Sequence, residues 1–163
     1  MFSVRYVART LKNKINRASN ISVNIRKFSL QKNNVYYTKT HETIKYIDNN
    51  IVKIGVSDYA KEKMGDIVYI DVENIDENYI KGDTLCIIES VKAVSDIETL
   101  WDGTIIEHNT ELIENIDDID TIDEKISSWI FKYKLDLNND NNDSLLIDLM
   151  DDIEYKKYIE TIE

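Results

Sequence analysis

A turn that leads directly into an apolar strand occurs three times in this chain, and this repeat constrains the fold more than any other feature. The copies are Gly65–Val68, Gly82–Leu85 and Asp102–Ile105, and each places a Gly/Asp turn before apolar residues. β-branched residues also concentrate in runs such as Ile51–Ile54. Repeated turn-then-strand units are typical of small barrels and sandwiches. The sequence therefore predicts a mostly β body over residues 36–135.

One short helix is expected to interrupt the strands. The segment Asp58–Met64 consists of good helix formers, with Ser57 or Asp58 available as the N-cap. Gly65 follows as a natural terminator, because glycine accepts the left-handed backbone that often ends a helix. One or two helical turns fit between these signals.

The C-terminal part is expected to form a second helix. Asn138–Asp143 is rich in Asn and Asp and indicates an exposed linker, after which Asp143 or Ser144 could cap a helix. The apolar residues that follow helical spacing are Leu146, Leu149, Met150 and Ile153. We therefore expect residues 143–163 to be a helical extension that packs on the β body.

Charged residues are distributed unevenly along the chain. Residues 1–41 carry nine Arg or Lys and no acidic residue. Because the whole chain is formally −11 and this stretch is +9, residues 42–163 carry a formal charge of −20. Such a body repels phosphate backbones, which argues against a nucleic-acid partner. Its acidity and the lack of a long apolar run also argue against a membrane partner.

Residues 1–28 have the composition of a mitochondrial transit peptide: basic, free of acids, and with several Ser and Asn. Arg26-Lys27-Phe28-Ser29 is similar to a matrix-protease site, with Arg two residues before the aromatic. The alternative is a disordered basic tail. The expected location is the mitochondrial matrix.

Metal and cysteine chemistry are not expected. The chain has one cysteine, Cys86, and two histidines, His41 and His108, too few for a Cys/His zinc site or an intrachain disulfide. Cys86 lies in the apolar run Leu85–Ile88, so we interpret it as a small buried hydrophobe. No partner for either histidine can be identified from the sequence.

The segment Thr84–Leu100 contains the residues with the clearest functional interpretation. An apolar run leads to Lys92, and a further run follows it. If the two runs pair as a hairpin, Lys92 stands at its tip, where a group attached to the amine could reach another protein. The alternative is an ordinary solvated lysine, and the spacing does not separate the two.

Lys92 and its neighbours carry a resemblance to a known family. Glu89-Ser90-Val91-Lys92-Ala93-Val94-Ser95-Asp96 resembles the lipoylation motif of glycine cleavage H-proteins. Supporting matches are His41-Glu42, Ile54–Ala60, Met64–Asp66, Gly82, Gly103 and Leu149–Asp151, so the resemblance spans roughly residues 40–163. It implies a barrel-sandwich hybrid of the lipoyl/biotinyl-carrier type. It also implies lipoate in amide linkage to Lys92, with Glu89, Ser90, Val91 and Ala93 as the surrounding motif.

The resemblance further implies a carrier that is itself no catalyst. A lipoate ligase or a lipoyl/octanoyl transferase would acylate Lys92. The arm would then take an aminomethyl group from the pyridoxal-phosphate glycine decarboxylase and pass it to the tetrahydrofolate-dependent aminomethyltransferase. Dihydrolipoyl dehydrogenase would reoxidise it. Glu42 and Asp96 match family positions in the cleft that holds the loaded arm, and the alternative for both is a plain solvated acid.

Two other functions remain open on the sequence. In one, the protein is a lipoyl relay from which the acyl group passes to the ketoacid dehydrogenases without glycine turnover. In the other it is an unmodified interaction domain, which the intact motif around Lys92 argues against.

Overall fold

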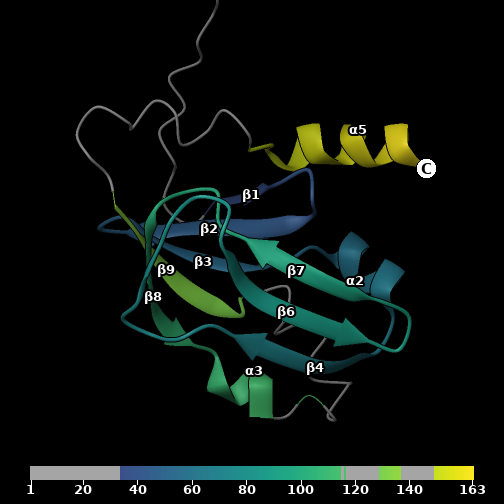
Figure 1. Ribbon diagram of the computed structural model, residues 1–163. Coiled ribbons are helices and arrows are strands. Elements are labelled where there is room, and N and C mark those ends of the chain that lie inside the picture. The colour runs from purple at the N-terminus through teal and green to yellow at the C-terminus, as the bar shows by residue number, and fades with distance from the viewer. Residues whose placement is uncertain (1–33, 115, 117–128, 137–148) are drawn as a thin grey trace, which may run out of the picture.

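The computed structural model describes residues 34–114, 116, 129–136 and 149–163 (Figure 1). The predicted transit peptide over residues 1–28 and the predicted linker over residues 138–143 lie outside the described residues. Within them the chain forms two antiparallel sheets and short helices. This confirms the mostly β fold that the repeated turn-strand units predict.

The larger sheet has the order β1-β2-β3-β9-β8-β5. Asn49 and Asn50 join β2 to β3 with φ values of 48° and 64°, a conformation that asparagine tolerates in tight hairpins. The strands are β1 (Val35–Tyr37), β2 (Glu42–Asp48), β3 (Ile51–Val56), β9 (Phe131–Leu135), β8 (Gly103–His108) and β5 (Asn78–Tyr79).

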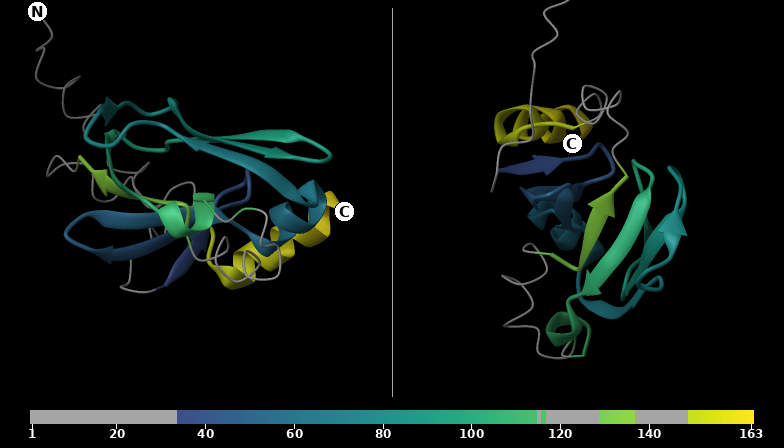
Figure 2. Two further views of the ribbon diagram at one scale, coloured as in Figure 1. Left: turned by 90° about the horizontal axis from the view of Figure 1, so that it is seen from below. Right: turned by 90° about the vertical axis from the view of Figure 1, so that its left-hand side faces the viewer.

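The smaller sheet has the order β4-β6-β7, with β4 at Ile67–Val72, β6 at Thr84–Ser90 and β7 at Val94–Glu98. In the left view of Figure 2 the teal strands of the smaller sheet lie opposite the blue strands β2 and β3 of the larger one. Ile70, Ile88 and Ile97 of these strands are buried, whereas their neighbours Tyr69, Glu89 and Asp96 are exposed, as the period of two in a strand requires. The smaller sheet therefore has one buried face and one outer face.

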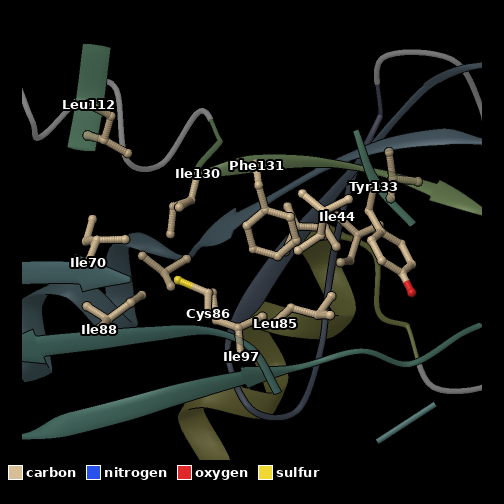
Figure 3. Packing of buried hydrophobic residues seen from close by; sticks show 14 of the residues in the cluster. Ile44, Ile70, Leu85, Cys86, Ile88, Ile97, Leu112, Ile130, Phe131 and Tyr133 are labelled. Atoms are coloured by element: carbon tan, nitrogen blue, oxygen red, sulfur yellow. The ribbon is translucent and has the colours of Figure 1, made fainter. Parts of the chain in front are cut away.

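The hydrophobic core lies between the sheets (Figure 3). Val52, Phe131 and Tyr133 line it from the larger sheet, and Leu85 and Ile88 line it from the smaller one, each fully buried. Burying side chains of this size stabilises the fold by about 1.5–3 kcal/mol each. Side chains from both sheets thus form one core, and the inner face of the smaller sheet is buried in it.

Cys86 is part of this core, as the sequence predicts. Its side chain is buried, and burial raises the pKa of its thiol to about 12, with further contributions from the carboxylates of Asp71 and Asp96. A thiol held in its neutral form is a poor nucleophile.

Helix α2 spans Asp58–Met64, the bounds that the sequence predicts. Ser57 is its N-cap, since the Ser57 hydroxyl accepts a hydrogen bond from the amide of Ala60. Gly65 is its C-cap, with a φ of 76°. A second short helix, α3, spans Thr110–Glu114. Among the described residues, no helix is long and apolar enough to cross a membrane.

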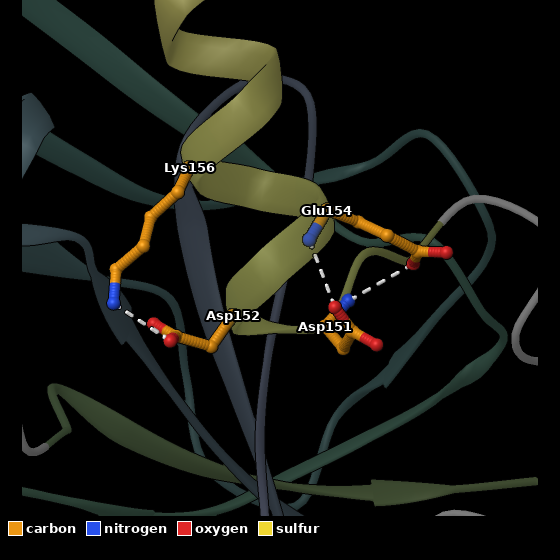
Figure 4. A network of polar contacts seen from close by, with 4 residues as sticks. All are labelled: Asp151, Asp152, Glu154 and Lys156. Atoms are coloured by element: carbon orange, nitrogen blue, oxygen red, sulfur yellow. Dashed lines mark hydrogen bonds and ion pairs between the residues drawn. The ribbon is translucent and has the colours of Figure 1, made fainter.

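The C-terminal helix α5 spans Asp152–Ile162 and lies beside β1 (Figure 1). Asp151 caps it: the Asp151 carboxylate accepts from the Glu154 amide at 2.8 Å, and the Glu154 carboxylate accepts from the Asp151 amide at 3.3 Å (Figure 4). Lys156 also pairs with Asp152 at 2.8 Å. This reciprocal cap sets the first turn of the helix.

The predicted C-terminal helix is confirmed and Leu149 packs against the core, but the apolar stripe predicted for the helix is wrong in the part that the structure describes. Leu149 and Met150 precede the helix, and Met150 forms an isolated β-bridge with Tyr37. Ile153 is 64% exposed, and the buried residue of α5 is Tyr155. The strong cap at Asp151 starts the helix later than the spacing indicates. The expected caps Asp143 and Ser144, and Leu146, lie outside the described residues.

Candidate functional site

Lys92 stands at the tip of the hairpin formed by β6 and β7, which confirms the pairing that the sequence leaves conditional. The hairpin register pairs Glu89 with Val94, and the chain reverses over the residues between them. The amide of Ser90 donates to the carbonyl of Ala93 at 2.8 Å and closes the turn. Lys92 is exposed, so its amine is accessible from solvent.

The hydroxyl of Ser90 stabilises this turn through hydrogen bonds to its backbone. It accepts hydrogen bonds from the amides of Lys92 at 3.2 Å and Ala93 at 3.0 Å, and it donates to the carbonyl of Ala93 at 3.0 Å. A serine side chain that satisfies the backbone of its own turn fixes the turn geometry. Ser90 thus positions the backbone of Lys92.

A second contact ties the turn to the start of β4. The amide of Val91 donates to the carbonyl of Asp66 at 2.9 Å, and Ser90 pairs with Ile67. The side chain of Lys92 lies over Gly65, because a Cβ built there would stand 3.0 Å from its Nζ and 3.1 Å from its Cε. The end of α2 and the lysine turn are therefore packed together.

The other motif residues surround Lys92 at the surface. Glu89, Val91 and Ala93 are all exposed. No carboxylate of the described residues lies within 4 Å of the Lys92 amine. An exposed lysine at a hairpin tip, with no ion pair to another described residue, fits a covalently attached arm.

Glu42 and Asp96, the two expected cleft acids, occupy different environments. Glu42 begins β2 and is 7% exposed, and its carboxylate accepts hydrogen bonds from the hydroxyls of Thr38 and, at 2.6 Å, Thr40. Asp96 is exposed on β7, opposite Ile87. The hydrogen bonds of Glu42 thus go to its own loop, and none joins it to Asp96.

His41, for which the sequence offered no partner, belongs to a polar cluster at the other end of α2. Its Nδ1 lies 2.8 Å from the hydroxyl of Tyr155, and that hydroxyl lies 2.6 Å from Oγ of Ser57, the N-cap of α2. Tyr155 also stacks on Tyr37 with ring centroids 4.2 Å apart. Sequence reasoning missed this cluster because 114 residues separate His41 from Tyr155.

The second histidine has a simpler environment. Nε2 of His108 lies 2.8 Å from the carbonyl oxygen of Glu73. In the part of the chain that the structure describes, no group of three His, Cys, Asp or Glu side chains is placed to hold a metal ion. Neither histidine lies in the lysine turn.

The two facing sheets and the lysine at an exposed hairpin define a lipoyl-carrier-like protein. A solved H-protein structure from Mycobacterium marinum, described as a glycine cleavage system H protein, has the same fold with a TM-score of 0.60. It is 23% identical, and the match covers 81% of this chain and 98% of that one. At that identity the likeness concerns the fold.

The sequence comparisons identify the family. The family model described as glycine cleavage H-protein matches residues 35–162, and the chain belongs to this family. A probable glycine cleavage system H protein of Thermococcus gammatolerans is 37% identical over 131 residues, covering 80% of this chain and 93% of the relative. One from Picrophilus torridus is 40% identical over 126 residues, covering 77% and 94%.

These relatives are archaeal, and the H proteins of Halothermothrix orenii and Paraburkholderia phytofirmans are further matches. Their resemblance establishes the family but lends no support to a mitochondrial location. The transit peptide over residues 1–28 therefore stays a prediction.

Proposed function

We propose that the protein is a lipoyl carrier of the glycine cleavage system, with lipoate in amide linkage to Lys92. The observation that carries this proposal is the position of Lys92 at the tip of a braced hairpin, within Glu89-Ser90-Val91-Lys92-Ala93. Family membership supplies the system in which it works. In this role the chain is a substrate of other enzymes.

Attachment requires an enzyme because a lysine amine is protonated at neutral pH and is then a weak nucleophile. Once deprotonated, the Lys92 nitrogen forms a bond to the acyl carbon, the bond to the activating group breaks, and that group leaves with the electron pair. A lipoate ligase or a lipoyl/octanoyl transferase would supply the activated acyl group. The bound cofactor would supply a disulfide able to take up an aminomethyl group and two electrons.

The contribution of the chain is positioning. Ser90 and the carbonyl of Asp66 fix the turn, so Lys92 projects away from the sheets while its backbone stays in place. An exposed tip lets one arm serve three enzymes in turn. We propose as these partners glycine decarboxylase, aminomethyltransferase and dihydrolipoyl dehydrogenase.

Glu42 is the better of the two candidates for holding a cationic load on the arm. It is nearly buried, so its carboxylate is less screened by water than the exposed carboxylate of Asp96. It also lies at the N-terminal end of α2, whose C-terminal end contacts Lys92. We propose that the loaded arm lies along α2 toward Glu42.

Two measurements test the proposal. Intact-mass analysis of the native protein should show one lipoyl increment, and Lys92→Arg should abolish it because arginine cannot form the amide. Biotin on Lys92, or lipoate on another lysine, would refute the assignment.

The second measurement separates the carrier from the relay. The lipoylated protein should support glycine–bicarbonate exchange with a purified heterologous glycine decarboxylase. Glu42→Gln should shorten the lifetime of the loaded arm more than Asp96→Asn does. A lipoylated protein that is inert in this exchange would favour the relay to the ketoacid dehydrogenases.

We further propose a mitochondrial matrix location, supported by the acid-free basic stretch at residues 1–28. Import should remove a segment that ends near Phe28. N-terminal sequencing of the native protein tests this, and a chain from the organelle that still begins at Met1 would contradict it.

A further inference from the structure

Exposed apolar side chains gather around the lysine turn. Val68 is 53% exposed, Tyr69 50%, Val91 61% and Val94 65%. They make up half of the eight most exposed large apolar side chains in the described part of the chain. Single exposed apolar residues are ordinary, whereas a group of them marks an interaction surface.

The strand register places these residues on the outer face of the smaller sheet. Tyr69 pairs with Glu89, and Glu89 pairs with Val94, so the three form one row across β4, β6 and β7. Val68 lies in the bulge beside Tyr69, and Val91 follows at the tip. We call this set of residues the turn-side face.

Carboxylates flank the apolar residues. Asp71 and Asp96 both pair with Ile87, two residues along the strands from Tyr69, Glu89 and Val94, which puts them in the next row on the same face. All three acids of these two rows are exposed. Strands β4, β6 and β7 contain no Lys, Arg or His, so the charged side chains that these strands contribute to the face are all acidic. A complementary partner would present an apolar contact rimmed by basic side chains.

We propose that the turn-side face is the docking surface for the enzyme that acylates Lys92, and that Tyr69 and Val94 are its main contacts. This inference rests on the proposed function and names the partner that recognises the unmodified lysine. Tyrosine is frequent among the residues that contribute most to interfaces. The acids would steer a basic rim toward the turn.

The length of the Lys92 side chain before and after acylation indicates which enzyme binds this face. Before acylation Lys92 has only its own side chain, so the acylating active site must approach the turn and touch the residues next to it. After acylation the arm can extend its reactive end a full arm length from the sheet, and an enzyme that uses the extended arm need not contact the turn-side face. The docking surface next to the turn therefore belongs to the acylation step.

The apolar part of the proposal is tested with Tyr69→Ser and Val94→Ser. Ile80→Ser is the matched control, because Ile80 is 65% exposed and lies outside the face. With a purified lipoate ligase, lipoate and ATP, we expect kcat/KM for acylation to fall by about tenfold in each test variant, mainly through KM. Ile80→Ser should match the wild type, and Tyr69→Phe should retain most of the rate because the ring remains.

The charged part is tested with Asp71→Lys and Asp96→Lys. Glu160→Lys, an exposed residue on α5, is the control with the same change of net charge. We expect both test variants to react several-fold more slowly at low salt and to lose most of the salt dependence of the wild-type rate. The control should keep the wild-type salt dependence.

Reduction of the lipoylated arm tests whether the turn-side face serves the acylating enzyme or the enzymes that use the arm. Tyr69→Ser, Val94→Ser and Asp71→Lys are each driven to full lipoylation with excess ligase and then reduced by dihydrolipoyl dehydrogenase and NADH. We expect reduction at the wild-type rate and an unchanged unfolding midpoint, because the substituted residues are exposed.

Acylation of Tyr69→Ser and Val94→Ser at the wild-type kcat/KM would overturn the proposal, as would an equal loss in Ile80→Ser. Slower reduction in parallel with slower acylation would also overturn it, because the face would then serve the enzymes that use the arm. Failure of the proposed function has a different signature, since the wild-type protein itself would then accept no lipoate on Lys92.

Discussion

The imidazole Nδ1 of His41 lies 2.8 Å from the hydroxyl of Tyr155 and so connects the loop before β2 to the C-terminal helix. The same hydroxyl lies 2.6 Å from Oγ of Ser57. If Ser57 donates to Tyr155, Tyr155 can donate to an unprotonated Nδ1, and the chain of hydrogen bonds is complete. A protonated imidazole has only donors and would break this order.

The first prediction is that acid weakens the fold through His41. Burial lowers the pKa of His41 below its usual value, and the nearby Glu42 partly opposes this shift. The unfolded chain therefore binds the proton more readily than the folded one. The stability from neutral His41 should be fully present above about pH 6.5 and lost as the pH falls through the folded pKa.

Urea unfolding midpoints between pH 8 and pH 5 measure this effect. His41→Gln should flatten the pH dependence in that window. His108→Gln is the control, since His108 is the second histidine of the chain and lies outside the cluster. An unchanged slope in His41→Gln would contradict the prediction.

The second prediction concerns the hydroxyl of Tyr155. Tyr155→Phe keeps the ring that stacks on Tyr37 but removes the hydroxyl that meets Ser57 and His41. Tyr155 is 4% exposed, so its former partners lose a shielded hydrogen bond. We expect a loss of about 1–2 kcal/mol in the free energy of unfolding. Combining Tyr155→Phe with His41→Gln should cost less than the sum of the two changes.

The third prediction is that Ser90 sets the geometry of the lysine turn. Ser90→Ala removes the hydroxyl that bonds the amides of Lys92 and Ala93. We expect faster hydrogen exchange at those two amides and a stability loss of about 0.5–1.5 kcal/mol. Ser90→Thr keeps the hydroxyl and should restore slow exchange. Equal exchange in both variants would show that the backbone alone holds the turn.

The fourth prediction is that Cys86 is inert in the folded protein. Burial raises the pKa of its thiol to about 12, so almost no thiolate exists at neutral pH. A thiol reagent such as DTNB should label the chain only when it opens, and the labelling rate should follow denaturant concentration. Rapid stoichiometric labelling without denaturant would contradict the buried position.

The fold was predictable where local chemistry determines it. Turn residues such as Gly65 and Gly82 mark strand starts, and Ser57 and Gly65 bound α2 in both sequence and structure. The tip position of Lys92 follows from the apolar runs on either side. These signals lie within a few residues of the feature that they predict, so a single sequence is enough to find them.

What the sequence could not supply depends on long-range contacts. Tyr155 meets His41 and Ser57 only after the chain has folded, and nothing near Tyr155 indicates this. The burial of Glu42 likewise depends on the loop that brings Thr38 and Thr40 to its carboxylate. Helix α5 begins after Met150, although the apolar spacing predicts Met150 within the helix. The backbone of Met150 instead forms a β-bridge to Tyr37 of β1.

The last prediction compares two glycines that share an unusual backbone. Gly65 has a φ of 76° and Gly82 a φ of 95°, a region that side chains with a Cβ rarely adopt. Gly65→Ala and Gly82→Ala should each destabilise the fold by roughly 1–3 kcal/mol through this backbone strain. Stability alone therefore should not distinguish the two variants.

Acylation should distinguish them. A Cβ at Gly65 would stand 3.0 Å from Nζ of Lys92, whereas a Cβ at Gly82 would meet nothing within 4 Å. Backbone strain at Gly65 should also displace Asp66, whose carbonyl accepts a hydrogen bond from the amide of Val91. We expect a purified lipoate ligase to acylate Gly65→Ala several-fold more slowly than Gly82→Ala under conditions in which both are folded. Equal rates would show that the end of α2 does not position the lysine turn.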